Sequence, residues 1–145
     1  MLFVTVADVR AAVPATLVRG VVRPPPSRRL GSAPAWCPGL AVFRGALVPV
    51  VELSTLLFGA PSEARRLVVL ELPAEKGCSE PRRLGLLVRE VHGLGRLEAA
   101  LELPSILNVS DALTRASLDE TLTIALEPTR LLSDHDWSAL THEGA

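Results

Sequence analysis

Residues 39–53, with the sequence GLAVFRGALVPVVEL, decide the expected fold. The run 46–53 is rich in valine and apolar on both faces, which is typical of a strand buried on both sides. Pro49 cannot donate a hydrogen bond within a sheet, so this strand should lie at an edge, carry a bulge or bend. Gly45 supplies the backbone freedom of a tight turn. The segment therefore predicts a hairpin that turns at Arg44 and Gly45, with Arg44 at a rim because charged side chains are rarely buried unpaired.

Short strands recur along the rest of the chain. We expect a hairpin of residues 2–6 and 9–13, a strand over 65–72, a strand over 84–91 that bends or bulges at Gly93 and Gly95 and continues through 96–103, and a strand over 121–127. Many short strands separated by turn signals predict an all-β sandwich or barrel. The lack of a long amphipathic helix argues against a parallel α/β sheet.

The last of these strands alternates most clearly. Leu122, Ile124 and Leu126 should point to one face, and Thr121, Thr123 and Glu127 to the other. If the fold is a small barrel, side chains such as these three apolar ones should fill it and leave no enclosed cavity for a ligand.

Short helical pieces and one irregular connection complete the expected chain. Pro14 is a good first helical residue, so a single turn should follow it. Residues 54–58 form a short helix that Gly59 ends, and residues 128–132 and 134–140 form two more, with Asp134 as the N-cap of the second. Residues 24–26 are three prolines in a row and favour an extended polyproline II course.

Composition limits the class of protein. A chain of 145 residues with 48% hydrophobic and 21% charged residues is globular, and we expect one domain over residues 1–145. A net charge of -1 and an aromatic content of 3% argue against a nucleic-acid partner. No apolar run reaches the length of a membrane span, and the N-terminus lacks the pattern of a signal peptide. We expect a cytoplasmic protein in which Cys37 and Cys78 are reduced thiols.

The candidates for chemistry are weak. Residues 133–136 (SDHD) hold every residue type of a hydrolase triad, but four sequential neighbours cannot converge on one reacting atom, and a helix start is the better interpretation. The histidines His92, His135 and His142 lack metal-ligand spacing, so we expect no metal and no cofactor.

Three pairs of arginines, at residues 28–29, 65–66 and 82–83, are typical of solvated loop charges, with contact to a partner as the alternative. The residues alone leave three classes open: a protein-interaction adaptor, a ligand-binding barrel, and an enzyme with an unrecognised site.

The stretch GLAVFRGALVPVVEL resembles the signature of the CheW-like family, the bacterial chemotaxis coupling proteins. The matching positions are Gly39, Arg44, Gly45, Pro49, Glu52 and Leu53, with Glu52 in place of the more usual aspartate. Further segments resemble the family in the same order. They are VPATLVRGVVRPPP, RRLVVLEL, RRLGLLVREVHGL and TLTIALEPTRLL, and together they span essentially the whole chain.

The resemblance implies an all-β fold of two packed SH3-like five-stranded barrels with short helical turns. It also implies a non-catalytic adaptor that joins chemoreceptor signalling tips to the regulatory domain of a CheA-type histidine kinase. The receptor tip is expected in a groove between the barrels, a form of helix-in-groove recognition. By position, the residues at or near that groove are Val18, Gly39, Arg44, Leu67, Val68 and Leu94; the alternative for Val18, Leu67 and Val68 is a place in the core.

Two positions depart from the family pattern. Gly20 stands where family members often carry a glutamate that can pair with the signature arginine, so Arg44 must lack that partner or find another in Glu52 or in the receptor. Arg89 replaces the family's aspartate and reverses its charge, which leaves the kinase contact open. The alternatives are an accessory adaptor that binds receptors but not the kinase, and a small-ligand-binding β-barrel.

Overall fold

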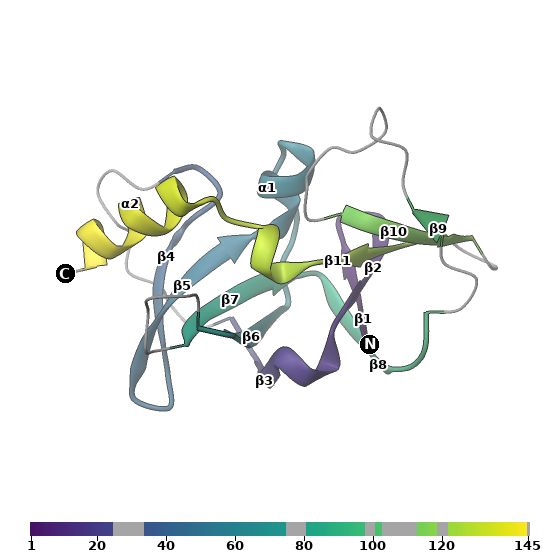
Figure 1. Cartoon of the computed structure of the whole chain (residues 1–145), viewed down its shortest axis with the longest axis horizontal. Helices are drawn as coiled ribbons and strands as arrows, with labels where there is room; N and C mark the ends of the chain where they lie inside the picture. Colours follow the sequence, from purple (N-terminus) through teal and green to yellow (C-terminus); the bar gives the residue numbers. More distant parts are fainter. Residues whose placement is uncertain (25–33, 75–80, 98–100, 103–112, 119–121, 145) are drawn as a thin grey trace.

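The computed structural model describes residues 1–24, 34–74, 81–97, 101–102, 113–118 and 122–144. The chain is all-β with short helices, as the sequence predicts (Figure 1). The strands are β1 (Leu2–Val6), β2 (Val9–Val13), β3 (Val18–Val22), β4 (Gly39–Phe43), β5 (Ala46–Glu52), β6 (Arg66–Leu72), β7 (Arg82–Val88), β8 (Glu90–Leu94), β9 (Leu101–Glu102), β10 (Leu113–Leu118) and β11 (Leu122–Leu126). The helices are η1 (Ala15–Leu17), α1 (Leu53–Phe58), η3 (Pro128–Arg130) and α2 (Asp134–Gly144).

Several sequence-based expectations concern residues that the structure does not describe. The polyproline course over 24–26, the arginine pair at 28–29, Cys78, and the continuation through 96–103 lie wholly or partly outside the described residues, as do Thr121 and the side chains of Leu122 and His142.

The described strands form two sheets. One sheet has six strands in the order β8-β1-β2-β11-β10-β9, and the other has five in the order β3-β6-β7-β5-β4. The chain starts in the six-stranded sheet, passes to the five-stranded sheet for β3 to β7, and returns with β8 (Figure 1). The six-stranded sheet is therefore built from two parts of the sequence, which are joined by the antiparallel pairing of β1 with β8 and the parallel pairing of β2 with β11.

The hairpin predicted from residues 39–53 is present as β4 and β5. Phe43 pairs with Ala46, and the two residues between them, Arg44 and Gly45, have φ angles of 49° and 78°. Two consecutive left-handed residues are the mark of a type I′ turn, whose twist suits a two-residue hairpin. Pro49 pairs with Leu40 in β4, and the parallel pairing of β5 with β7 begins only at the next residue. Pro49, which lacks an N–H donor, thus lies where β5 is paired with only one strand, β4.

The second half of β5 is buried on both faces, as the valine-rich pattern predicts. On β5, Val50 is 2% exposed and belongs to a small cluster on one face, while Val51 is 0% exposed and belongs to the main core on the other. That main core lies between the two sheets and includes Val4 of β1, Leu53 of α1 and Leu126 of β11. Each fully buried valine or leucine stabilises the fold by roughly 1.5–3 kcal/mol.

The five-stranded sheet curls until its two edge strands meet. A Cβ atom added to Gly20 of β3 would lie 2.7 Å from Cζ of Phe43 of β4, although these strands are at opposite ends of the sheet order. The inside of this barrel is filled, because a Cβ atom added to Gly85 would lie 2.9 Å from Cδ1 of Leu67. A packed interior of this kind is typical of a small barrel.

Two details of the strands differ from the sequence-based expectations. The strand expected over 84–91 divides at Arg89, where the chain leaves the five-stranded sheet; β8 then carries an irregularity opposite Phe3 and Val4, next to Gly93 as expected. Both faces of β11 are covered, since Thr123 is 6% and Leu126 is 2% exposed.

Helix α2 begins one residue earlier than expected. The backbone N–H of Asp136 donates to Oγ of Ser133 (3.1 Å), and the backbone N–H of Ser133 donates to Oδ2 of Asp136 (2.9 Å). This reciprocal pair is a capping box, so Ser133 and not Asp134 is the N-cap. The SDHD motif is therefore explained as a helix start. No helix in the described part of the chain is long and apolar enough to cross a membrane.

Candidate functional site

Arg44 lies at the tip of the β4–β5 hairpin and is exposed, which confirms its expected place at a rim. Its Cζ atom is 5.0 Å from the centre of the Phe43 ring, so the guanidinium rests on an aromatic face. Among the described residues, no carboxylate lies within ion-pair distance of Arg44. A φ of 49° is uncommon for a residue other than glycine, so the backbone here is held in a sparsely populated conformation.

A small hollow lies beside Arg44 at the open end of the five-stranded barrel. Its volume is about 90 Å³, well below the roughly 300–1,000 Å³ of sites for drug-sized ligands. The lining comes from the turn and from strands β3, β4, β6 and β7, and consists of Arg19, Phe43, Arg44, Val69, Leu70, Glu71 and Arg83. The hollow therefore suits one polar group rather than a whole small molecule.

One ion pair lies in the lining of the hollow. Nε of Arg19 lies 3.0 Å from Oε2 of Glu71, and Nη1 of Arg19 also donates to the carbonyl oxygen of Thr16 at 2.9 Å. Arg83 is directly opposite Glu71 in the pairing of β6 with β7, yet no carboxylate within the described residues lies in ion-pair distance of it. Among the described lining residues, three guanidinium groups thus accompany one carboxylate, and positive charge is in excess there.

Gly20 is explained by its contact with Phe43. Any side chain at this position would collide with the ring that supports Arg44. Residue 20 therefore offers no carboxylate to Arg44, whose guanidinium rests on the aromatic ring of Phe43. Glu52 does not replace that carboxylate, because it lies at the far end of β5 and accepts a hydrogen bond from Oγ1 of Thr55 at 2.9 Å.

Two of the expected groove residues are core residues. Leu67 is 1% exposed and packs inside the five-stranded barrel, while Val68 is 0% exposed and packs in the main core on the opposite face of β6. Their side chains are buried in this chain, which agrees with the alternative of a place in the core. Gly39 is also buried, and Val18 is half-buried against the main core.

Leu94 is the most exposed of the expected apolar residues. Its side chain is 75% exposed at the end of β8, which is an edge strand of the six-stranded sheet. Arg44 belongs to the other sheet, so the predicted site residues are divided between the two sheets. A second exposed apolar group is the cross-strand pair of Val42 and Leu47 in the β4–β5 hairpin, with exposures of 66% and 61%.

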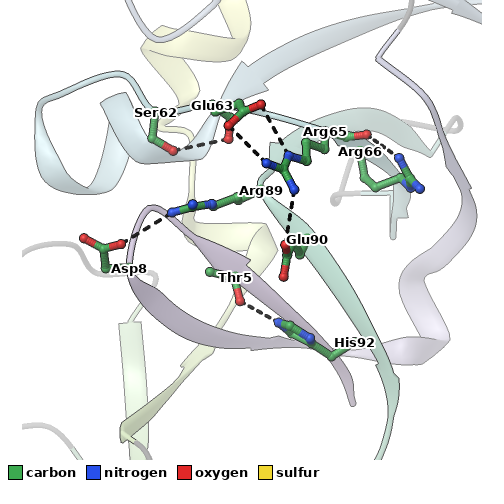
Figure 2. Close-up of polar contacts among 9 residues, drawn as sticks. All are labelled: Thr5, Asp8, Ser62, Glu63, Arg65, Arg66, Arg89, Glu90 and His92. Atoms are coloured by element: carbon green, nitrogen blue, oxygen red, sulfur yellow. Dashed lines mark hydrogen bonds and ion pairs between the residues drawn. The ribbon is translucent and has the colours of Figure 1, made fainter.

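Arg89 lies at the crossing from β7 to β8. Its backbone N–H donates to the carbonyl oxygen of Thr5 at 2.8 Å, and its Nη1 atom lies 3.5 Å from Oδ1 of Asp8. Figure 2 shows Arg89 reaching toward Asp8, in the turn between β1 and β2. The reversed charge at this position is thus matched by an acidic residue within the same chain.

Arg65, which directly precedes β6, contacts Glu90 at the start of β8. Its guanidinium contacts Glu63 at 3.3 Å and Glu90 at 3.5 Å (Figure 2). The hydrogen bond and charge of Glu63 raise the pKa of Arg65, so this arginine stays charged. Exposed ion pairs of this kind contribute little to stability.

Cys37 is a buried thiol near the start of β4. It is 3% exposed, and its Sγ atom lies 3.7 Å from the carbonyl oxygen of Gly39. Burial raises the pKa of Cys37 above its ordinary value of 9.0, and the hydrogen bonds to Gly39 and Val50 offset only part of this effect. The thiol is therefore neutral at physiological pH. Within the described residues, no group of three or more histidine, cysteine, aspartate or glutamate side chains could hold a metal ion.

The described residues thus form an all-β protein with a filled five-stranded barrel and with exposed arginine and leucine side chains, which are suited to contacts with other macromolecules. The chain belongs to the CheW-like domain family, whose model matches residues 1–136. Members of this family are non-catalytic scaffold proteins of chemotaxis, and this chain is accordingly a chemotaxis adaptor and not an enzyme.

The fold is also found among solved structures. The scaffolding protein TtCheW from Thermoanaerobacter tengcongensis is similar to this chain with a TM-score of 0.72 and 17% sequence identity, over 87% of this chain and 86% of that one. This likeness confirms the expected arrangement of two SH3-like barrels. No curated protein matches the chain significantly.

The sequence does not predict that Arg19, Glu71 and Arg83 line one hollow. Of its charged residues, Arg83 carries a sequence signal only as part of an arginine pair, which is typical of loop charges and has contact to a partner as its alternative; it lies in β7 and not in a loop. Arg19 and Glu71 carried no signal of their own. Glu71 lies opposite Arg83 because β6 pairs with β7 in this register. The alternation of residues along the two strands would predict this contact only if the register were known.

Proposed function

We propose that this adaptor binds the signalling tip of chemoreceptors and connects it to the regulatory domain of a CheA-type histidine kinase, in the cytoplasm beside membrane-bound receptor arrays. The observation that carries the proposal is Arg44, an exposed arginine in the family's signature turn that has no carboxylate partner among the described residues. A planar guanidinium can make two parallel charge-assisted hydrogen bonds to a partner.

The receptor contact would also use Leu94, whose exposed side chain can lose water on binding. Val18 and Gly39 would act by shaping the backbone near the contact, since they offer little or no side-chain surface. Leu67 and Val68 would support the fold only.

A second candidate is an accessory adaptor that binds receptors without the kinase. Arg89 favours it, because an arginine stands where the family carries an aspartate and is paired with Asp8 within the chain. A kinase surface that recognises an acidic residue at this position would meet a positive charge instead.

One experiment separates the two candidates. The chain is immobilised and offered, in separate reactions, a purified receptor signalling-tip fragment and a purified kinase regulatory domain. Retention of both supports the coupling adaptor, and retention of the tip alone supports the accessory adaptor. Retention of neither by a folded chain contradicts the proposed function.

A further inference from the structure

At the open end of the five-stranded barrel, the described residues carry more positive than negative charge. Arg19, Arg44 and Arg83 surround the hollow, and Glu71 is the one acidic residue in its lining. The ion pair of Arg19 with Glu71, at 3.0 Å, accounts for one positive and one negative charge. Arg44 and Arg83 remain, and both are exposed.

Both remaining arginines are held by regular structure. Arg44 is fixed by a two-residue turn and by the Phe43 ring 5.0 Å away. Arg83 lies in β7, between β6 and β5 in the sheet order, and directly opposite Glu71. Because Glu71 already faces Arg19, it does not neutralise Arg83. Neither guanidinium group has a carboxylate partner among the described residues. The two groups come from a turn and a strand that are distant in sequence, and both line this hollow.

The size of the hollow limits its occupant. A volume of about 90 Å³ is well below that of sites for drug-sized ligands and suits a single side-chain group. A phosphate dianion would bring two negative charges close to the carboxylate of Glu71, whereas an acidic side chain brings one. The charge and the size therefore favour a single carboxylate.

We propose that this hollow receives an acidic side chain of the protein partner, with Arg83 and Arg44 as its hydrogen-bond donors and the pair of Arg19 and Glu71 as a fixed wall. The inference rests on the proposed function, because the partner is taken to be the receptor tip. It assigns Arg83 a binding role and names the chemistry that the partner must supply.

The test compares two variants that lose the same charge. Arg83→Gln removes a donor from the hollow, and Arg66→Gln removes an exposed arginine at the other end of β6, about 17 Å along the strand from Glu71. Binding of each variant to a receptor signalling-tip fragment is measured by calorimetry. Arg83→Gln should weaken binding roughly tenfold or more, which is the scale of one charge-assisted hydrogen bond. Arg66→Gln should stay within about twofold of the wild type.

A scan of the tip fragment identifies the acidic residue. Each Glu or Asp of the tip is changed to Gln or Asn in turn, and each variant is measured against the wild type and Arg83→Gln. One tip variant should weaken binding to the wild type and have much less effect on Arg83→Gln, because the two changes remove the same contact. Inorganic phosphate at matched ionic strength should not compete with the tip.

The outcomes distinguish this inference from the proposed function. If Arg83→Gln binds the tip as well as Arg66→Gln does, the inference is wrong while the adaptor function stands. Competition by inorganic phosphate would show that the hollow is a phosphate site and would also overturn it. If the folded wild-type chain does not bind the tip, both the proposed function and this inference fall.

Discussion

Gly20 and Phe43 close the five-stranded barrel by direct contact between its two edge strands. A Cβ atom at residue 20 would lie 2.7 Å from Cζ of Phe43, which is closer than real Cβ contacts allow. The same ring carries the guanidinium of Arg44 at 5.0 Å. One small residue on β3 therefore sets the position of the aromatic ring and, through it, of the arginine that we propose as the receptor contact.

Gly20→Ala should lower the free energy of unfolding by about 1–2 kcal/mol, because Phe43 must move from its half-buried site to accept the added carbon. Urea denaturation measures the change. In a Phe43→Ala background the same substitution should cost much less, since the ring is absent. If Gly20→Ala lowered the free energy of unfolding equally in the wild type and in Phe43→Ala, the contact between residue 20 and the ring would not constrain the barrel.

Ser133→Ala should lower the free energy of unfolding by about 1 kcal/mol, because it removes the oxygen that accepts the backbone N–H of Asp136. The matched control is Ser138→Ala, an exposed serine within the same helix, which should leave stability within about 0.5 kcal/mol. A cost at residue 138 equal to that at residue 133 would mean that the capping box contributes nothing.

Cys37 should make stability fall at alkaline pH. Burial raises the pKa of the folded thiol, so the unfolded chain loses its proton first as pH rises. The contribution of the neutral thiol is therefore full below the ordinary value of 9.0 and declines above it. Denaturation of the wild type and Cys37→Ala between pH 7 and pH 10 should show a steeper alkaline decline in the wild type. Parallel curves would contradict the buried, neutral thiol.

Local features were predictable from the sequence because short-range chemistry determines them. The β4–β5 hairpin follows from Arg44 and Gly45 between two apolar runs, and the end of α1 follows from Gly59, whose φ is 78°. The N-cap of α2 was misplaced by one residue, since Ser133 and Asp134 are both good N-caps and only the hydrogen bond to Asp136 decides between them.

Features that depend on strand pairing were not predictable in the same way. Arg19, Arg44, Glu71 and Arg83 meet because β3, β6 and β7 are neighbours and because the sheet curls onto β4. The burial of Leu67 and Val68 on opposite faces of one strand has the same origin. A continuous apolar run indicates a strand covered on both sides. The run that contains Leu67 and Val68 therefore favours a place in the core for both residues over a place in a groove.

Arg44 provides the most direct test of the adaptor account. Calorimetric titration of a receptor signalling-tip fragment into the wild type and Arg44→Ala should give affinities that differ by about 1–3 kcal/mol, because a charged and partly desolvated hydrogen bond is lost. The free energy of unfolding should change by no more than about 1 kcal/mol, since the arginine is exposed and has no carboxylate partner in the described part of the chain. A variant that is clearly less stable but binds the tip with unchanged affinity would show that Arg44 supports the hairpin and that the receptor binds elsewhere.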